Sequence, residues 1–207
     1  MPATLHTVYS DAFLVVAEKP AGLLAVPGRG EDKQDCMAAR VQAEFPDARV
    51  VHRLDMATSG LMVLARGAEM QRRLSQAFHD REVAKRYVAL VGYRLRQVAG
   101  EISLPLMADW PNRPLQKVDH DAGKAALTRY RVLDYDASVD VSRLELEPVT
   151  GRTHQLRVHL AALGHPIVGD ALYGGIIAHR LMLHAGFMGL RHPATGEALT
   201  FTSTAPF

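Results

Sequence analysis

Apolar residues recur along the chain at two spacings, one typical of strands and one typical of helices. Short apolar runs at 13–17 and 61–65, each next to turn-forming residues, predict two buried strands. Alternating apolar and polar positions at 126–133 and 141–149 predict a half-buried antiparallel pair. We expect further strands at 86–91, at 101–107 as its hairpin partner, at 181–183 and at 199–202.

Three segments repeat their apolar residues at helical spacing. Residues 35–45 and 67–80 each predict an amphipathic helix, and the outer face of the second is basic. We expect a third helix that is capped by Thr153 and ends at Gly164. The inward-facing residues are Met37, Val41 and Phe45 in the first helix, Met70, Leu74 and Phe78 in the second, and Leu156, Leu160 and Leu163 in the third. Seven or eight strands with three helices predict an α+β fold on a large, mostly antiparallel mixed sheet flanked by helices and loops.

The composition excludes several classes of protein. The chain has 207 residues, 48% of them hydrophobic, and no repeat or linker divides it, so we expect one folded domain over 1–207. The longest apolar runs have about five residues, against roughly twenty for a membrane span, and the N-terminus lacks the pattern of a secretory signal. Cys36 is the single cysteine and cannot form an internal disulfide. We therefore expect a cytoplasmic protein that does not cross a membrane.

Charge is nearly balanced overall but unevenly placed. The formal net charge is +2, and arginine supplies 19 of the 24 basic residues. Between Arg49 and Arg96 there are ten basic residues against four acidic ones. Such an arginine-rich local excess is typical of a surface that binds RNA or DNA, although an ordinary solvated face would have the same composition.

The sequence gives little support for a metal site or for a nucleotide-binding loop of a common type. The chain has ten histidines, but His154 and His159 are five residues apart, about 140° around a helix, and would not share one face. The Gly-x-Gly at 28–30 lacks the lysine and helix of a phosphate-binding loop, and there is no Gly-x-Ser-x-Gly segment. Cys36 is interpreted as a core residue rather than a nucleophile.

One carboxylate stands out. Asp55 lies beside a Thr-Ser-Gly turn at a strand end, where an ordinary turn-capping role would also suit an aspartate. The segment 52–61, His-Arg-Leu-Asp-Met-Ala-Thr-Ser-Gly-Leu, resembles the catalytic motif of the RluA family of pseudouridine synthases and matches that family's His-Arg-Leu-Asp-x-x-Thr-Ser-Gly pattern without a departure.

Further segments resemble the same family in the same order. They are Glu-Lys-Pro-Ala-Gly-Leu at 18–23, Lys-Arg-Tyr-Val-Ala at 85–89, Thr-Gly-Arg-Thr-His-Gln-Leu-Arg-Val-His at 150–159, Gly-His-Pro-Ile at 164–167, Gly-Asp at 169–170, Leu-Met-Leu-His-Ala at 181–185 and His-Pro at 192–193. The resemblance covers residues 8–207 and implies one catalytic domain without an N-terminal S4-type RNA-binding domain. Segments 109–114 and 116–118 are similar to the family's dual-specificity member, which acts on both rRNA and tRNA.

The resemblance implies an activity and a set of catalytic residues. Members break the C1′–N1 bond of a uridine in RNA, turn the uracil over and join its C5 to the ribose. Asp55 matches the catalytic aspartate, which either attacks C1′ or acts as a base at C2′, and Arg152 matches the arginine that favours its ionised form. Tyr87 matches the tyrosine that stacks on the base and helps remove the C5 proton. Leu183 matches a position that lines the uracil pocket, and plain core packing is its alternative.

The resemblance also implies the partners. The target nucleotide must be flipped out of its stack, and we expect Arg53 to fill the vacated space, while Arg72, Arg73 and Arg86 contact phosphates. The expected partners are stem-loops of 23S rRNA and tRNA, with no cofactor, no metal ion and a monomeric enzyme. Three alternatives stay open: a synthase with a different single target, a glycosylase or nucleosidase that uses Asp55, and an RNA-binding or chaperone module with an idle site.

Overall fold

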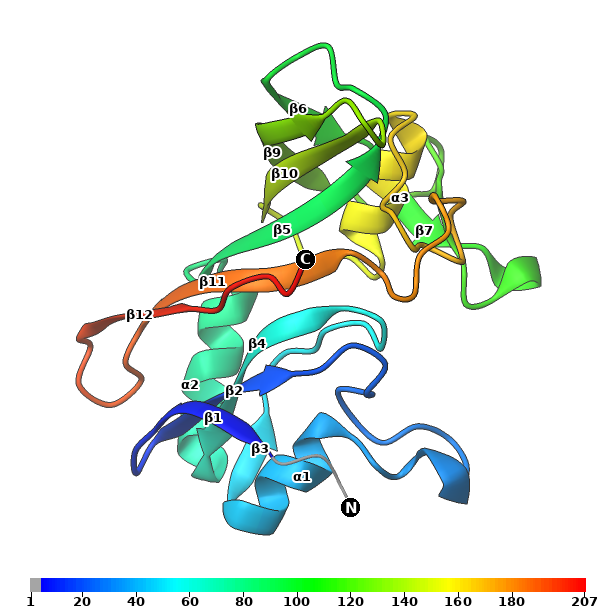
Figure 1. The fold of residues 1–207 in the computed structure, drawn as a ribbon. Coiled ribbons are helices and arrows are strands. Elements are labelled where there is room, and N and C mark those ends of the chain that lie inside the picture. The colour runs from blue at the N-terminus through cyan, green and yellow to red at the C-terminus, as the bar shows by residue number, and fades with distance from the viewer. Residues whose placement is uncertain (1–4) are drawn as a thin grey trace. The chain divides into compact units, whose positions relative to one another are not determined.

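The computed structural model describes residues 5–207, which form two compact units. Unit 1 contains residues 5–85 and Ala185–Pro206, and unit 2 contains Arg86–His184 together with Phe207 (Figure 1). The helices within residues 5–207 are all too short or too polar to cross a membrane.

Unit 1 is built on antiparallel strands. Its strands are β1 (His6–Ser10), β2 (Leu14–Lys19), β3 (Ala48–Val50), β4 (Ser59–Arg66), most of β11 (Leu183–Arg191) and β12 (Ala198–Thr202). Their order is β1-β2-β4-β11, with β3 also paired to β4 and β12 to β11. The register of β2 on β4 runs from Leu14 opposite Ala65 to Lys19 opposite Gly60. The predicted strands at 13–17 and 61–65 are therefore confirmed and form neighbours, whereas β1 escaped prediction.

The helices of unit 1 confirm the helical spacing. α1 (Met37–Glu44) has Cys36 as its N-cap, and the Sγ of Cys36 accepts a hydrogen bond from the backbone N–H of Ala39 at 3.4 Å. α2 (Gly67–His79) follows β4 directly and buries Met70 and Leu74. Cys36 is fully buried, in agreement with its interpretation as a core residue. A short 3-10 helix, η1 (Glu31–Lys33), precedes α1.

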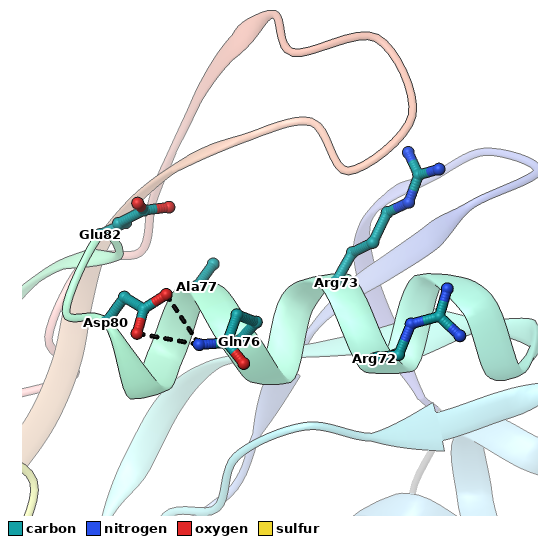
Figure 2. A pocket seen from close by; sticks show the side chains of 6 residues that line it. All are labelled: Arg72, Arg73, Gln76, Ala77, Asp80 and Glu82. Carbon is teal, nitrogen blue, oxygen red and sulfur yellow. Dashed lines mark hydrogen bonds between the residues drawn. The ribbon is translucent and has the colours of Figure 1, made fainter.

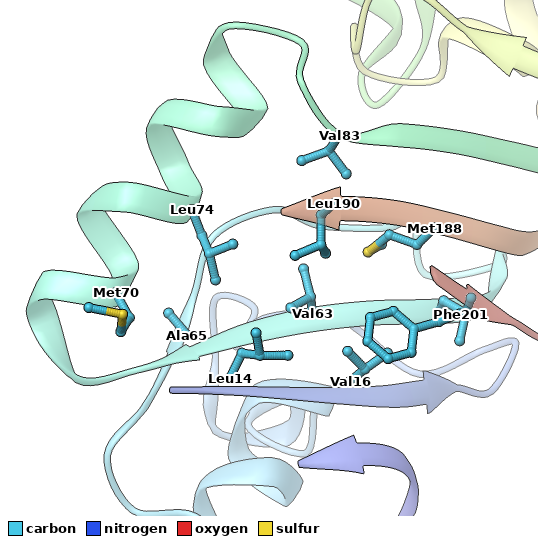
Figure 3. Packing of buried hydrophobic residues seen from close by; sticks show 11 residues of the cluster. Leu14, Val16, Val63, Ala65, Met70, Leu74, Val83, Met188, Leu190 and Phe201 are labelled. Carbon is cyan, nitrogen blue, oxygen red and sulfur yellow. The ribbon is translucent and has the colours of Figure 1, made fainter. Parts of the chain in front are cut away.

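The core of unit 1 lies between α2 and the strands (Figure 3). Leu74 and Met70 on α2 point toward Val63 and Ala65 on β4, and the cluster continues to Phe201 on β12. All of these side chains are less than 10% exposed. Burial of apolar side chains of this size contributes about 1.5–3 kcal/mol each, so this packing fixes β4, the strand that follows the Asp55 segment.

Unit 2 has its own antiparallel strands and one α-helix. Its elements are the larger part of β5 (Ala84–Gly92), β6 (Ala99–Ser103), β7 (Leu106–Ala108), the 3-10 helix η2 (Trp110–Asn112), β8 (Gln116–Val118), β9 (Leu127–Asp136), β10 (Val141–Pro148) and α3 (Gln155–Ala162). The strand order is β5-β10-β9-β6, and β7 pairs with β8 as a separate hairpin. The predicted antiparallel pair of 126–133 with 141–149 is confirmed as β9 and β10.

The prediction that 101–107 forms a hairpin with 86–91 is wrong. β5 pairs instead with β10, from Gly92 opposite Val141 to Tyr87 opposite Leu146. The segment 101–107 is divided at Pro105, which has no backbone N–H to continue a strand. Its first part pairs with β9 as β6, and its second part pairs with β8 as β7.

Four smaller expectations are also corrected. Thr153 does not cap α3: His154 precedes the helix with a left-handed backbone, φ 53°, and makes no side-chain capping bond. Leu163 lies just past the helix end and is 42% exposed rather than inward-facing. The strand expected at 181–183 begins only at Leu183, as β11. Residues 5–207 contain twelve strands, more than the seven or eight expected, because several have only three residues.

Candidate active site

Asp55 lies in the loop that leads into β4. The loop closes on itself where the backbone N–H of Thr58 donates to the carbonyl of Asp55 at 3.1 Å. Leu54 is buried and anchors the loop, Asp55 is half-buried, and Arg53 is exposed. Arg53 makes no hydrogen bond or ion pair with any other residue between 5 and 207. The loop therefore holds its carboxylate in a half-buried position, while Arg53, two residues before it, is exposed.

A buried lysine joins this loop to the end of β2. Lys19 is 1% exposed, and its ammonium donates to the carbonyls of Pro20, Leu23 and Met56 at 2.8, 2.7 and 2.9 Å. Met56 directly follows Asp55, and its carbonyl also accepts the backbone N–H of Gly22 at 2.9 Å. The segment 18–23 thus fixes the backbone next to the candidate aspartate.

His52 ties the other end of the loop to β4. Its Nε2 accepts the backbone N–H of Val63 at 3.0 Å, and its ring stacks on Phe78 of α2 with centroids 4.4 Å apart. Burial, with a contribution from the positive charge of Lys85, lowers the pKa of His52 to about 3. Burial also lowers the pKa of Lys85, whose ammonium lies 5.9 Å from the centre of the Phe78 ring. His52 is therefore a neutral structural acceptor.

The glycine of the Thr-Ser-Gly turn is required by a close approach of two strands. Gly60 has φ 115°, and a Cβ built on it would lie 2.4 Å from the carbonyl oxygen of Ala185 on β11. Backbone atoms cannot move aside as a flexible side chain can, so only glycine lets β4 pass here. Thr58 and Ser59 are buried beside it.

Unit 2 carries the other candidate catalytic residues. Tyr87 is half-buried on β5, opposite Leu146 of β10. Its neighbour Arg86 is exposed and lies 3.8 Å from Glu145. Leu183 is 3% exposed at the start of β11, which satisfies both of its interpretations, a pocket wall or core packing.

Arg152 is held by a buried glutamine. The Oε1 of Gln155 accepts the backbone N–H of Arg152 at 3.0 Å and the hydroxyl of Thr150 at 2.7 Å. Its Nε2 donates to the carbonyl of Leu127 and to the hydroxyl oxygen of Thr128, both at 3.0 Å. The Arg152 side chain is exposed, and its Nε donates to the carbonyl of Ala125 at 3.2 Å. Gln155, 4% exposed, thus shapes the loop that presents the arginine.

Behind this loop lies a buried ion pair. Arg157 on α3 donates to both oxygens of Asp170 at 2.8 and 2.7 Å. Oδ1 of Asp170 also accepts the backbone N–H groups of Leu172 and Tyr173. The sequence patterns alone assign no role to Lys19, Arg157 or Asp170. Their presence inside the matched motifs was the signal that could have found them.

The outer face of α2 carries a shallow depression of about 510 Å³ (Figure 2). Its lining residues are Arg72, Arg73, Gln76, Ala77, Asp80 and Glu82. Arg73 is engaged with Glu69 and with the carbonyl of Pro193, whereas Arg72 is exposed and forms no ion pair within residues 5–207. Gln76 donates to both oxygens of Asp80 at 2.9 Å. The face expected to be basic is thus mixed in charge, with Arg72 as its most available cation.

The structure distributes the predicted residues between the two units. Asp55, Arg53, Arg72 and Arg73 belong to unit 1, and Arg86, Tyr87, Arg152 and Leu183 belong to unit 2. Within residues 5–207, no three His, Cys, Asp or Glu side chains are grouped so that they could hold a metal ion.

Comparisons with known proteins find relatives over nearly the whole chain. Residues 13–162 match the family described as RNA pseudouridylate synthase. The chain is 47% identical over 207 residues to the dual-specificity RNA pseudouridine synthase RluA of Escherichia coli K12, covering 98% of this chain and 94% of that protein. It is 44% identical over 211 residues to the protein of the same name from Haemophilus ducreyi, with coverage of 98% and 94%.

Solved structures agree with this match. Human RNA pseudouridylate synthase domain containing 1 superposes with a TM-score of 0.81 at 30% identity, covering 98% of this chain and 84% of that one. Human RNA pseudouridylate synthase domain containing 4 gives a TM-score of 0.77 at 26% identity, with coverage of 97% and 88%. The predicted fold class, a large mixed sheet with few helices, is confirmed.

Proposed function

Because the chain belongs to the RluA-type pseudouridine synthase family and isomerises uridine in RNA, we propose that Asp55, Tyr87 and Arg152 are its catalytic residues and that its substrates are specific stem-loop uridines. The match of the 52–61 segment to the family's catalytic motif carries this assignment. In this proposal, residues 1–207 form one catalytic domain. The enzyme works in the cytoplasm as a monomer, without a metal ion or cofactor.

The reaction needs a carboxylate that can act on the ribose. Asp55 either attacks C1′ as a nucleophile or removes a proton from C2′, and in both routes the C1′–N1 bond breaks while the base stays bound. The uracil then turns and its C5 bonds to C1′, which displaces Asp55 from C1′ in the first route and is accompanied by return of the proton to C2′ in the second. The C5 proton is lost to a base, and N1 takes up a proton. The half-buried position of Asp55 and the anchoring of its loop by Lys19 support this role, because a catalytic group must be held in place.

The other two catalytic residues act on the base and on the charge. Tyr87 stacks on the uracil and its phenol oxygen assists removal of the C5 proton. Arg152 is the cationic group of the site, and the hydrogen bond from its backbone to Gln155 supports a fixed position for it. Leu183, buried at the start of β11, is the proposed apolar wall of the uracil pocket.

The arginines proposed to hold the RNA differ in how free they are. Arg53, which we propose enters the stack when the target nucleotide flips, and Arg72 are exposed and form no ion pair within residues 5–207. Arg73 and Arg86 have acidic neighbours, Glu69 and Glu145. A phosphate must compete with these carboxylates, so we expect Arg53 and Arg72 to contribute more to binding.

The proposed targets are uridine 746 of 23S rRNA and uridine 32 of tRNA anticodon stem-loops. The names of the relatives from E. coli and H. ducreyi support a dual specificity. A synthase with one other rRNA or tRNA target is the second candidate, because related enzymes with other targets share most of these motifs.

Release of tritium from C5-labelled uridine RNA tests the proposal. We expect release from both stem-loops with the wild-type protein and none with Asp55→Ala, while Asp35→Ala, which removes an exposed aspartate, should behave as the wild type. Release from one of the two stem-loops only would overturn the dual specificity, and release from a single other rRNA or tRNA alone would support the second candidate. Free uracil among the products would identify a glycosylase, and the absence of release from any transcript or bulk RNA would overturn the proposal.

A further inference from the structure

The only tryptophan of the chain stands on the surface of unit 2. Trp110 opens η2, in the turn that joins β7 to β8, and is 64% exposed. The guanidinium carbon of Arg113 lies 3.2 Å from the centre of the Trp110 ring. Large aromatic side chains normally bury their area, and an exposed one paired with an arginine is typical of a binding surface.

The turn that carries this pair is cross-linked by hydrogen bonds. The backbone N–H of Asp109 donates to the carbonyl of Leu115 at 2.9 Å, and the N–H of Asn112 donates to the carbonyl of Asp109 at 3.0 Å. The Asn112 side chain also donates to the Asp109 carboxylate at 2.9 Å. The turn therefore presents the indole in a fixed position, so little conformational entropy is lost when a ligand binds to it.

The base of the same hairpin is attached to the Arg152 loop. The backbone N–H of Gln116 on β8 donates to the hydroxyl of Tyr173 at 2.9 Å, and that hydroxyl lies 2.7 Å from Nδ1 of His154. Leu106 on β7 packs with Val158 on α3 in a small buried cluster. The hairpin and the loop that presents Arg152 are thus held to one another within unit 2.

We propose that Trp110 and Arg113 form a platform on which an unpaired base of the substrate RNA stacks, outside the target uridine. The guanidinium lies against the indole, and because Trp110 is still 64% exposed the ring has accessible area on which a base can stack. Stacking of a base on an aromatic side chain contributes about 1–3 kcal/mol, and the guanidinium attracts the phosphate next to that base. The proposal rests on the proposed stem-loop substrate and adds a residue pair that selects the loop.

Tryptophan fluorescence reads this site directly, because Trp110 is the sole tryptophan. Titration of the wild-type protein with each stem-loop should quench the fluorescence to saturation. Stem-loops with a single abasic position should identify one loop nucleotide whose removal abolishes the quench while the RNA still binds in a filter assay. Binding without any quench would overturn the platform and leave the proposed function standing. Absence of tritium release from every RNA would instead defeat the proposed function.

Kinetics provide a second and independent test. Trp110→Ala should raise KM for the stem-loop about 5- to 150-fold, the factor that corresponds to about 1–3 kcal/mol, and leave kcat near the wild-type value. Trp110→Phe keeps an aromatic face and should recover most of the loss. Ile177→Ala removes an apolar side chain from a residue that is 98% exposed and serves as the control. A wild-type KM for Trp110→Ala, at an unchanged melting temperature, would overturn the platform and indicate a surface for a protein partner.

Discussion

The backbone N–H of Val63 donates a hydrogen bond to Nε2 of His52 at 3.0 Å, which requires that nitrogen to carry no proton. The ring is also stacked on Phe78. Protonation of Nε2 would remove the acceptor for the Val63 N–H and place a second positive charge near Lys85. Burial, together with the positive charge of Lys85, lowers the pKa of His52 to about 3. The neutral form of His52 is thus part of what fixes the Asp55 loop to β4.

Stability should therefore depend on pH through His52. In the unfolded chain the imidazole has its ordinary pKa of 6.5. Between pH 6.5 and about 3 the unfolded state therefore binds a proton at His52 that the native state does not bind. The free energy of unfolding is highest above pH 6.5 and should fall as the pH falls, by at most about 1.4 kcal/mol per pH unit from this group. Urea unfolding at pH 7.5, 6 and 5 measures the slope.

The matched variants isolate this contribution from that of His159, whose pKa is also lowered by burial. Glutamine takes up no proton at this position. Below pH 6 the free energy of unfolding of His52→Gln should therefore change less steeply with pH than that of the wild type, by the equivalent of about one proton taken up on unfolding. His120→Gln changes an exposed histidine and should leave the slope unaltered. Equal slopes for the wild type and His52→Gln would contradict the assignment.

Lys19 should be essential to the Asp55 loop because it satisfies three carbonyls at once. Lys19→Met retains the apolar stem but leaves the carbonyls of Pro20, Leu23 and Met56 without this donor. Loss of buried hydrogen bonds to a charged group should lower the free energy of unfolding by about 3 kcal/mol, and kcat should fall more than KM rises. Chemical unfolding and stem-loop kinetics check the two effects.

An exposed lysine gives the comparison for this variant. Lys33→Met in η1 should change the free energy of unfolding by no more than about 0.5 kcal/mol. If Lys19→Met were as stable and as active as Lys33→Met, the ammonium would have no part in holding the loop.

Features that depend on neighbours along the chain could be predicted from the sequence. The helix α2 follows from the spacing of Met70 and Leu74, because helical contacts join residues three or four apart. The partner of β5 could not be found in this way, since alternation predicts a strand but not which strand it pairs with. Pro105 lies inside the segment 101–107 that alternation predicts as one strand, and a proline in this position indicates an interruption of the strand.

In the candidate site, too, the features that depend on neighbouring residues can be predicted from the sequence, and those that depend on distant residues cannot. Asp55 was found because its whole motif is contiguous in the sequence. The structural roles of Lys19 and Gln155 include hydrogen bonds to the carbonyls of Met56 and Leu127, which lie far from them along the chain. Residue type gives no indication of such partners, since a lysine is most often exposed. Only the fold reveals that Lys19 is buried among carbonyls.

The phenol oxygen of Tyr87 should be needed for turnover but not for binding. Tyr87→Phe keeps the aromatic face that stacks on uracil and removes the oxygen that assists loss of the C5 proton. We expect an unchanged Kd for the stem-loop and tritium release slower by about 100-fold or more. Tyr93→Phe, at a tyrosine that is 53% exposed, should match the wild type in both assays. Wild-type rates for Tyr87→Phe would restrict Tyr87 to stacking.

The ion pair of Arg157 with Asp170 should stabilise unit 2 strongly, because its two side chains are only 5% and 0% exposed. Arg157→Leu leaves a buried carboxylate without its partner, and we expect the free energy of unfolding to fall by about 3–5 kcal/mol. Arg129→Leu breaks an ion pair with Glu101 in which both side chains are about half exposed, and should cost less than about 1 kcal/mol. Equal losses from the two variants would contradict this prediction.

Replacing both members of the buried pair should recover only part of that loss. Apolar residues often substitute for a buried ion pair without penalty, but Asp170 also accepts the backbone N–H groups of Leu172 and Tyr173. In the double variant Arg157→Leu with Asp170→Leu these donors lose their acceptor, which costs about 1–3 kcal/mol. Urea unfolding should place the double variant between the wild type and Arg157→Leu. Full recovery would mean that the two N–H groups find water instead, and that Asp170 serves the charge of Arg157 alone.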